Sequence, residues 1–530
     1  MRKQTKLVAV LSAAALLAMG ASMTSFAAGW QKDDAGVWHY YDSDDDMVTG
    51  EWKKDGGKWF YLDDDGDMLT DSWVDDDYYV GDDGAMLTNA WKYTMADDDQ
   101  DDPDEDGEHW YYFNNKGKKV TSGTSETKKI NGKTYCFNED GEMQYGWQEI
   151  DGEGYYFGDE NDGARKESQW MWLEKSGMLD EDDDEDQEKI LECDEDDDCD
   201  DEGWYWFQSS GKVYHGTDKK KINGRYYLFN DHGQMLYEWI NTNSVNKPGS
   251  NAQLDDKGAA AASVSEMRYY NVVEEGWRAN GWYQIDGSKD VGTDSDTDWY
   301  YVDDGEVKHA DKLQKDFATY DEDKKPVYVA RIKVEGKYFA FNEDGQMQTG
   351  LQYINNDGAF YYFDENGYQK TGKVASVECD DDDYTFYFNT KNGKNGQGYT
   401  GEKDGYLYYN GKRLEADDDY RLYYVDGDVY LVNNKGKVQK SNKKYDIENK
   451  GIAAEDVDVT FTSSKSKKVA KVGDLTKDQL IASIDWANDK VTEDQKVSVP
   501  FIQLYDDDVY TYNNDTEHKA SSWRQLNLTR

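Results

Sequence analysis

Tryptophans at fixed spacing are the residues of this chain most suited to chemistry. Trp52 and Trp59 stand seven residues apart in the stretch GEWKKDGGKWFYLDDDGDMLTDSW, residues 50–73. The face of an aromatic ring attracts a quaternary ammonium ion by roughly 0.5–2 kcal/mol, and it can also stack on a sugar ring. These side chains therefore predict non-covalent binding of a cation or a glycan, rather than bond breaking.

Residues that catalyse reactions form no recognisable pattern. Among 112 Asp and Glu, paired carboxylates occur at any spacing by chance. No GxSxG, phosphate-loop, HExxH or Cys/His pattern is present. The histidines are isolated from one another: His39, His109, His215, His232, His309 and His518. We therefore predict that the chain is not an enzyme, and a wall hydrolase with an unrecognised C-terminal module is the alternative.

The net charge and the N-terminal segment indicate the location of the protein and the charge of its partners. Residues 1–27 carry three positive charges, then an apolar run and small residues, which predicts a signal peptide. Its removal changes the net charge from −52 to about −55. Such acidity excludes nucleic acid as a partner and favours cationic ones. No second apolar run approaches the ~20 residues that span a bilayer. We expect a secreted protein.

Acidic runs recur at one position of a longer repeat, before Trp110, Trp204, Trp299 and Tyr384. Clustered carboxylates suit Ca²⁺, and the segment 63–67 offers four of them, but the glutamate of an EF-hand loop is absent. Calcium is therefore a candidate ligand of the acidic runs. Solvated loops that repel one another are the simpler interpretation.

The elements that position the aromatics are short strands. Counted from Gly66, an aromatic triad closes four residues earlier, and Met68, Thr70 and Trp73 follow at fixed offsets. Units of about twenty residues with these offsets recur along the chain, and such units bury their apolar faces by stacking on their neighbours. We predict strands at residues 59–62 and 67–70 that form a hairpin. The fold class is therefore all-β, a solenoid of stacked hairpins with acidic loop insertions.

The domain boundaries follow the quality of the repeat. After the signal peptide, residues 28–95 hold the most regular repeats, and residues 96–440 hold further aromatic hairpins with acidic insertions. From residue 441 the repeat fades. In this unassigned C-terminal segment of α+β or β type, 441–530, we expect one helix over 475–488 and a pair of strands over 497–512.

The motif GW-x(6)-WFYL-x(3)-G-x-M-x-T resembles the choline-binding or cell-wall-binding repeats of Gram-positive surface proteins, related to repeats of clostridial toxins and glucan-binding proteins. This resemblance implies that the secreted chain is associated with the cell surface or cell wall, where it binds a cell-wall polymer, either choline-bearing teichoic acid or a glycan. It also implies that each binding site is a cage built from the GW tryptophan, the first triad aromatic and an aromatic of the following hairpin. Carried over by position, the cage residues are Trp30, Trp38 and Tyr61, then Trp52, Trp59 and Tyr79.

Two positions depart from the motif, and the sequence leaves alternative functions open. Asp77 replaces the first aromatic of its triad, and Leu351 replaces a GW tryptophan. Many of the aromatics would serve only to hold one hairpin to the next. A host- or glucan-directed adhesin and a calcium-responsive structural surface protein are the alternative functions.

The four cysteines suggest little cross-linking. Cys193 and Cys199 bracket DEDDD and could close a small disulfide loop outside the cell. Cys136 and Cys379 lie at or near strands and are interpreted as small apolar residues.

Overall fold

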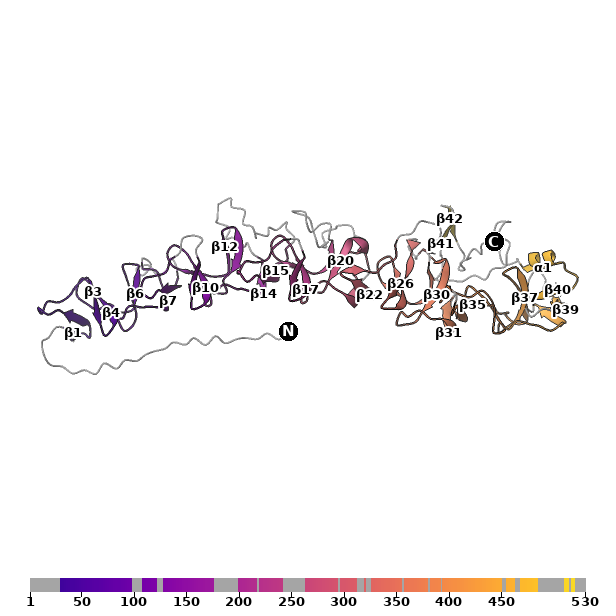
Figure 1. The fold of residues 1–530 in the computed structure, drawn as a ribbon, viewed down its shortest axis with the longest axis horizontal. Helices are drawn as coiled ribbons and strands as arrows, with labels where there is room; N and C mark the ends of the chain where they lie inside the picture. Colours follow the sequence, from indigo (N-terminus) through magenta and orange to yellow (C-terminus); the bar gives the residue numbers. More distant parts are fainter. Residues whose placement is uncertain are drawn as a thin grey trace. The chain divides into compact units, whose positions relative to one another are not determined.

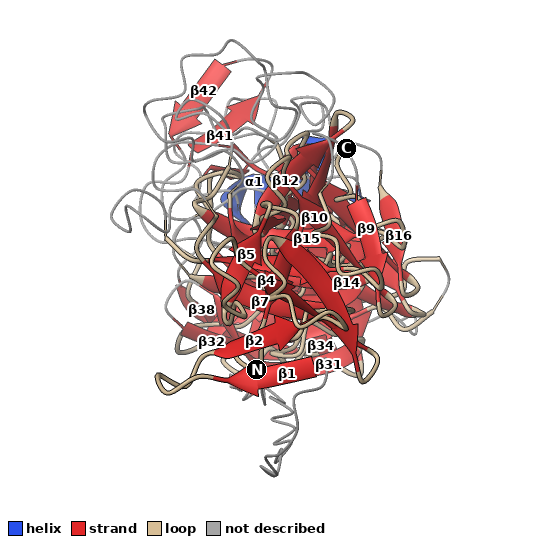
Figure 2. Cartoon of the chain, turned by 90° about the vertical axis from the view of Figure 1, so that its left-hand side faces the viewer, coloured by secondary structure: helices blue, strands red, loops and turns tan. Residues whose placement is uncertain are grey.

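The structure is a computed structural model, and it describes sixteen stretches of the chain: residues 29–97, 107–121, 127–175, 199–216, 219–241, 263–293, 296–311, 319–320, 326–354, 357–379, 382–391, 393–449, 454–462, 468–484, 510–513 and 516–519. The signal peptide, Cys193 and part of each acidic run lie outside these residues. The described part is almost entirely β, as predicted (Figures 1 and 2).

The chain divides into two compact units. The first comprises Met1–Trp170, Asp186–Ile190 and Phe207–Val213. Its strands are mostly paired as antiparallel hairpins: β1 (Gly29–Lys32), β2 (Trp38–Tyr41), β3 (Glu51–Asp55), β4 (Lys58–Leu62), β5 (Ser72–Val74), β6 (Tyr78–Val80), β7 (Ala90–Thr94), β8 (His109–Phe113), β9 (Thr127–Ile130), β10 (Lys133–Phe137), β11 (Met143–Gln144), β12 (Trp147–Ile150) and β13 (Glu153–Tyr156).

The second unit comprises Met171–Glu185, Leu191–Trp206 and Tyr214–Arg530, and the division falls within β14 (Gln169–Glu174) and β15 (Glu202–Phe207). Its hairpins continue the same pattern: β16 (Lys220–Ile222), β17 (Arg225–Phe229), β18 (Met235–Leu236), β19 (Glu238–Asn241), the 3₁₀ turn η2 (Val264–Glu266), β20 (Met267–Tyr270), β21 (Gly281–Asp286), β22 (Thr297–Asp303), β23 (Glu306–Val307), β24 (Thr319–Tyr320), β25 (Pro326–Val327), β26 (Val329–Val334), β27 (Lys337–Asn342), β28 (Met347–Gln348), β29 (Gly350–Ile354) and β30 (Ala359–Phe363).

Two five-stranded sheets follow in the second unit. The first has the order β31 (Gly372–Cys379), β32 (Asp382–Phe388), β35 (Lys412–Arg413), β34 (Tyr406–Tyr409) and β33 (Gly401–Lys403). The second has the order β37 (Asp428–Asn433), β36 (Tyr420–Val425), β38 (Lys443–Ile447), β39 (Ala454–Phe461) and β40 (Val469–Val472). This second sheet joins strands from both sides of residue 440, the boundary predicted from the fading of the repeat.

The C-terminal elements differ in extent from those expected. The helix α1 covers Lys477–Ile484 rather than 475–488, and residues 485–509 lie outside the description. Helix α1 packs Leu480 and Ile484 into the apolar cluster of the second sheet. The strand pair is β41 (Tyr510–Asn513) with β42 (Thr516–Lys519), which begins further along the chain than the predicted 497–512.

The hairpin itself is placed differently from the prediction. Strand β4 pairs with β3, which precedes it, whereas the predicted return strand over 67–70 makes only a single bridge, from Leu62 to Met68. The β3–β4 turn is made by Gly56 and Gly57, whose φ angles of +54° and +86° supply the twist that a two-residue hairpin turn requires. The segment 63–67 instead directs the chain from one hairpin toward the next.

The acidic turn after each triad has a structural use. One carboxylate oxygen of Asp63 accepts the backbone N–H groups of Asp65 and Asp67, at 3.0 and 2.8 Å. Asn114 and Asn433 use a side-chain oxygen in the same way at later repeats. Aspartate and asparagine are therefore favoured at this position because their side chains can close the turn.

Neighbouring hairpins are joined by one recurring hydrogen bond. The residue two places after the turn glycine donates its N–H to the carbonyl at the start of the second strand in the hairpin before. In the first unit Met68 donates to Trp38 and Met86 to Trp59, both at 2.8 Å. In the second unit Arg278 donates to Tyr226 at 2.7 Å. Each hairpin is thus fixed to its predecessor in the same register.

The turn glycine is required by the stacking as well as by its backbone. Gly84 has a φ of +73°, and a Cβ atom there would lie 2.6 Å from the Cε of Met68, which belongs to the preceding repeat. The same contact recurs between Gly66 and Met47. Glycine and methionine therefore interlock from one repeat to the next wherever the motif has both residues.

Candidate ligand-binding cages

Aromatic side chains gather where one hairpin meets the next. In the first junction, Trp30 lies opposite Tyr40 and Lys32 opposite Trp38, so the two tryptophans share one face of the β1–β2 hairpin. The ring of Trp30 lies edge-on to Phe60 of the following hairpin, with 5.1 Å between centroids. Met68 is held beside Trp38 by its backbone hydrogen bond.

The second junction repeats this arrangement. Trp52 and Trp59 share a face of the β3–β4 hairpin, since Trp52 pairs with Tyr61 and Lys54 with Trp59. The ring of Trp52 lies 5.5 Å from Tyr78, on the next hairpin. Trp59 is 39% exposed, so one wall of this site faces solvent.

Two further junctions have the same four positions, and the cage assignment from the sequence missed them. In the first unit, Trp91 lies 6.5 Å from Trp110 and 4.9 Å from Tyr135, and Met143 belongs to the same apolar cluster. The sequence signal was present, because Trp110 opens a triad. The intervening acidic insertion hides the spacing from Trp91 to Trp110.

The corresponding junction of the second unit is built around Trp282. Its ring lies 6.5 Å from Trp299 and 4.7 Å from Phe339, and Met347 packs in the same cluster. Trp299 is 43% exposed, which matches the exposed position of Trp59. We call these four junctions the open cages and define them by their residues: Trp30, Trp38, Phe60 and Met68; Trp52, Trp59, Tyr78 and Met86; Trp91, Trp110, Tyr135 and Met143; Trp282, Trp299, Phe339 and Met347.

The ring from the following hairpin is not the one carried over from the motif. Tyr61 lies against Trp52 of its own hairpin, at 5.2 Å, and Tyr79 lies against Trp73 of its own hairpin, at 5.3 Å. The rings that contact the preceding tryptophans are Phe60 and Tyr78, one residue earlier in each strand. Successive side chains of a strand point to opposite faces, so a shift of one position exchanges the side chains that face the neighbouring hairpin.

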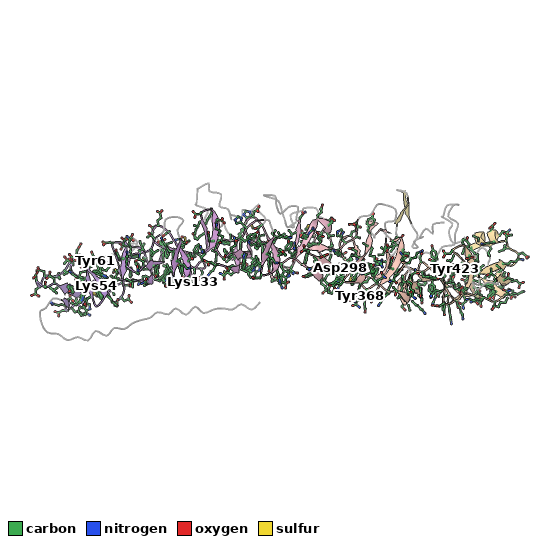
Figure 3. All side chains as sticks on the ribbon, in the orientation of Figure 1. Lys54, Tyr61, Lys133, Asp298, Tyr368 and Tyr423 are labelled. Atoms are coloured by element: carbon green, nitrogen blue, oxygen red, sulfur yellow. The ribbon has the colours of Figure 1, made fainter. Side chains whose placement is uncertain are left out.

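The electrostatic surroundings of the cages are acidic. Burial, together with the carboxylates of Asp75, Asp64 and Asp63, raises the pKa of Tyr61 above its usual value. The phenol therefore stays neutral, and the carboxylates provide a negative potential close to the rings. Figure 3 labels Tyr61 and Lys54 in this part of the chain.

The ring faces already attract cations of the chain itself. The exposed ammonium groups of Lys32 and Lys54 lie 5.5 Å from the ring centroids of Trp38 and Trp59. This distance is within the range of a cation–π interaction. The two tryptophans therefore present faces that a positive group can approach from solvent.

Metal ligands, cysteines and membrane-spanning helices are the other features to which the sequence draws attention. Within the described residues, no group of three or more His, Cys, Asp and Glu side chains is arranged to hold a metal ion, so calcium binding by the acidic runs stays a prediction. Cys136 is free and buried, as expected of a small apolar residue, and Cys199 takes part in a disulfide. None of the helices in the described part is long and apolar enough to cross a bilayer.

Stacked β-hairpins that repeat one junction geometry define the class, a β-hairpin repeat protein. Family comparison gives the kind of repeat. A choline-binding repeat family matches residues 46–86, a second choline-binding repeat family matches residues 123–170, and a putative cell wall binding repeat matches residues 28–44, 105–119 and 349–369. Both choline-binding matches lie in the first unit, and the cell wall binding repeat also matches residues 349–369 of the second unit. These matches confirm the predicted resemblance.

The solved structures to which the chain is similar include three from Streptococcus pneumoniae. The modular autolysin LytC is 17% identical with a TM-score of 0.32, over 65% of this chain and 52% of that one. Choline binding protein F, solved with a peptidoglycan analogue, is 18% identical with a TM-score of 0.32, over 71% and 100%. The choline-binding domain of CbpL is 22% identical with a TM-score of 0.25, over 39% and 97%. The chain thus spans about half of LytC. No curated protein sequence matches this chain.

Proposed function

We propose that the chain is an exported binding protein that attaches to a choline-bearing cell-wall polymer through the open cages. The observation that carries this proposal is the recurrence of two tryptophans, a ring from the next hairpin and a methionine at four hairpin junctions. Aromatic walls attract a quaternary ammonium through the negative faces of their rings. The net charge of −52 adds a long-range attraction for the same kind of ligand.

The family matches support the proposal from a separate direction. The first two cages lie mainly in residues that match the putative cell wall binding repeat and the choline-binding repeat. We further propose that attachment is the activity of this chain, without catalysis, and that the protein resides at the cell surface. A zymogram on cell walls tests the catalytic part directly, because a cleared band would overturn it.

A matched pair of variants tests the cages. Trp59 and Tyr145 are both exposed aromatic residues, at 39% and 50%, but only Trp59 belongs to an open cage. We expect Trp59→Ala to weaken choline at one site several-fold, as the loss of one cation–π wall predicts, and Tyr145→Ala to leave binding unchanged. Calorimetric titration of choline into the full chain measures both. Equal affinities and stoichiometries in the two variants would refute the proposal.

Glycan binding is the second candidate function, because Trp59 and Trp299 each present an exposed indole. A flat, exposed ring offers an apolar face that can also stack on a sugar. Elution from cell walls separates the two ligands. Release by choline supports the main proposal, and release by oligosaccharides, but not by choline, would support an adhesin that recognises glycans.

A further inference from the structure

One hairpin junction of the first unit is filled by a lysine of the chain itself. The junction begins at Trp73, and it has Asp77 where the open cages have their second tryptophan and Lys119 where they have methionine. The backbone N–H of Lys119 donates to the carbonyl of Asp77 at 2.6 Å, which is the hydrogen bond that Met86 makes to Trp59 in the preceding junction. Lys119 therefore occupies the methionine position of this junction.

The ammonium group of Lys119 lies among rings and a carboxylate. Its Nζ atom is 5.1 Å from the centroid of Trp73 and 5.8 Å from that of Tyr111. The same atom lies 2.6 Å from a carboxylate oxygen of Asp76. Only 7% of Lys119 is exposed, so the group is removed from water almost completely. Burying a charge is costly unless it is paired, and here the carboxylate and the two ring faces provide the pairing.

The aliphatic part of the Lys119 side chain packs against the next turn glycine, as the methionine does in other repeats. A Cβ atom on Gly141 would lie 2.9 Å from the Cγ of Lys119, as close as Gly66 comes to Met47. The exchange of methionine for lysine therefore keeps the interlock between repeats and adds a cation at the rings. This junction therefore has Asp77 in place of the second tryptophan and has the ammonium group of Lys119 against its remaining rings.

An arginine makes a similar arrangement in the second unit. Arg331 lies opposite Ala340, the position at which Trp52 faces Tyr61 in the β3–β4 hairpin. Its guanidinium carbon is 3.6 Å from the ring centroid of Tyr338 and 4.9 Å from that of Tyr361. A second positive side chain thus stands between the rings of two successive hairpins.

We propose that these two junctions are closed sites, in which a cation of the chain takes the place that a ligand cation would take. They fasten one hairpin to the next and bind nothing from solvent. The positions of Lys119 and Arg331 would then determine which junctions of the array are available to an external ligand. This inference uses the cage geometry of the proposed function, but it is tested separately from it.

Chemical rescue tests the closed site at Lys119. Lys119→Ala removes the cation and leaves space between Trp73, Tyr111 and Asp76. We expect a lower melting temperature, and we expect tetramethylammonium chloride to raise it by roughly 2 °C or more above the rise seen in the wild-type chain in the same salt. Sodium chloride at equal concentration corrects for screening. The matched control is Lys118→Ala, since Lys118 is the exposed neighbour that pairs with Asp77 at 3.0 Å.

The outcomes separate the two proposals. Extra rescue in Lys119→Ala but not in Lys118→Ala supports the closed site, even if the wild-type chain itself does not respond to the probe and the proposed function fails. Stabilisation of the wild-type chain without extra rescue in Lys119→Ala overturns the closed site and leaves the open cages supported. If the alanine variant does not fold, Lys119→Met restores the apolar interlock. One additional bound tetramethylammonium per chain would then support the inference, and an unchanged stoichiometry would overturn it.

Discussion

Met86 donates its backbone N–H to the carbonyl oxygen of Trp59, 2.8 Å away, so the methionine of one repeat is fixed beside the exposed tryptophan of the repeat before it. The same bond fixes Met68 beside Trp38. Each open cage therefore depends on the register between two hairpins. A residue that sets this register affects binding without touching the ligand.

The first prediction concerns which tyrosine forms the wall of the second cage. Tyr78 contacts Trp52 from the following hairpin, whereas Tyr79 packs against Trp73 in the core. We expect Tyr78→Leu to weaken one choline site several-fold with little change in the free energy of unfolding, because Tyr78 is only partly buried. Calorimetry and urea unfolding of the full chain measure the two effects. Unchanged choline affinity in Tyr78→Leu would show that Tyr78 does not contact the ligand and would favour Tyr79 as the cage ring.

The second prediction concerns the interlock of glycine and methionine. Gly57 and Gly84 both have positive φ, at +86° and +73°, but a Cβ on Gly57 meets nothing within 4 Å, whereas one on Gly84 meets Met68. Gly57→Ala should cost about 1–2 kcal/mol from backbone strain alone. Gly84→Ala should cost a further ~1–3 kcal/mol, because Met68 must move. Equal costs in urea unfolding would show that the contact with Met68 is easily relieved.

The third prediction is a dependence of stability on pH. The hydrogen bond from Lys92, at 2.5 Å, lowers the pKa of Asp71 below its usual value, and the hydroxyl of Tyr79 also donates to this carboxylate at 2.8 Å. The folded state thus holds the proton of Asp71 less tightly than the unfolded state does. The stabilisation is present above about pH 4 and is lost as the pH falls through the lowered pKa.

The variant Asp71→Asn isolates this contribution. The urea midpoint of the wild-type chain should exceed that of the variant at pH 7, and the difference should be smaller at pH 3, because the unfolded chain binds a proton at Asp71 more readily than the folded chain does. The difference at pH 7 should be small, because about half of the Asp71 side chain is exposed and water screens its ion pair with Lys92. A difference that is the same at both pH values would mean that the charge of Asp71 does not contribute to stability.

The sequence predicted the repeat and the aromatic strand at residues 59–62, because each depends on short-range spacing. Trp59 and Phe60 alternate between solvent and core as the pleat of a strand requires. The partner of β4 was missed although Gly56 and Gly57 mark a tight turn, because the acidic turn after Leu62 is an equally good turn sequence. The ring that contacts the preceding tryptophan lies one residue earlier in the strand than the ring carried over from the motif, since the offset alone does not say which face meets the next hairpin.

The role of Lys119 could not be predicted from the sequence for a different reason. Its position in the repeat is that of a methionine, but the direction of its ammonium depends on Trp73 and Tyr111, which are 46 and 8 residues away in the chain. A lysine beside acidic turns is usually a solvated surface residue. Only the stacking of hairpins brings the two rings and Asp76 around it.

The last prediction concerns the C-terminal sheet. A chain that ends at Lys440 lacks β38, β39, β40 and α1, which cover one side of β36 and β37. Leu422 and Leu431 are fully buried against these elements, and exposing each costs about 1.5–3 kcal/mol. The truncation also removes Asn449, whose side chain binds the backbone of Leu422. Its Oδ1 accepts from the N–H of Leu422 at 2.6 Å, and its Nδ2 donates to the carbonyl of Leu422 at 3.0 Å.

We therefore expect residues 420–433 to lose their hydrogen-exchange protection in this truncated chain, while the open cages keep their choline affinity. The cages should be spared because each repeat is stabilised mainly by its nearest neighbours. A chain that ends after Ile484 is the matched control, since it retains the whole apolar cluster and should keep full protection. Normal exchange at residues 420–433 in the shorter chain would show that β36 and β37 are held by the repeats before them, and loss of choline binding would show that the array unfolds as one unit.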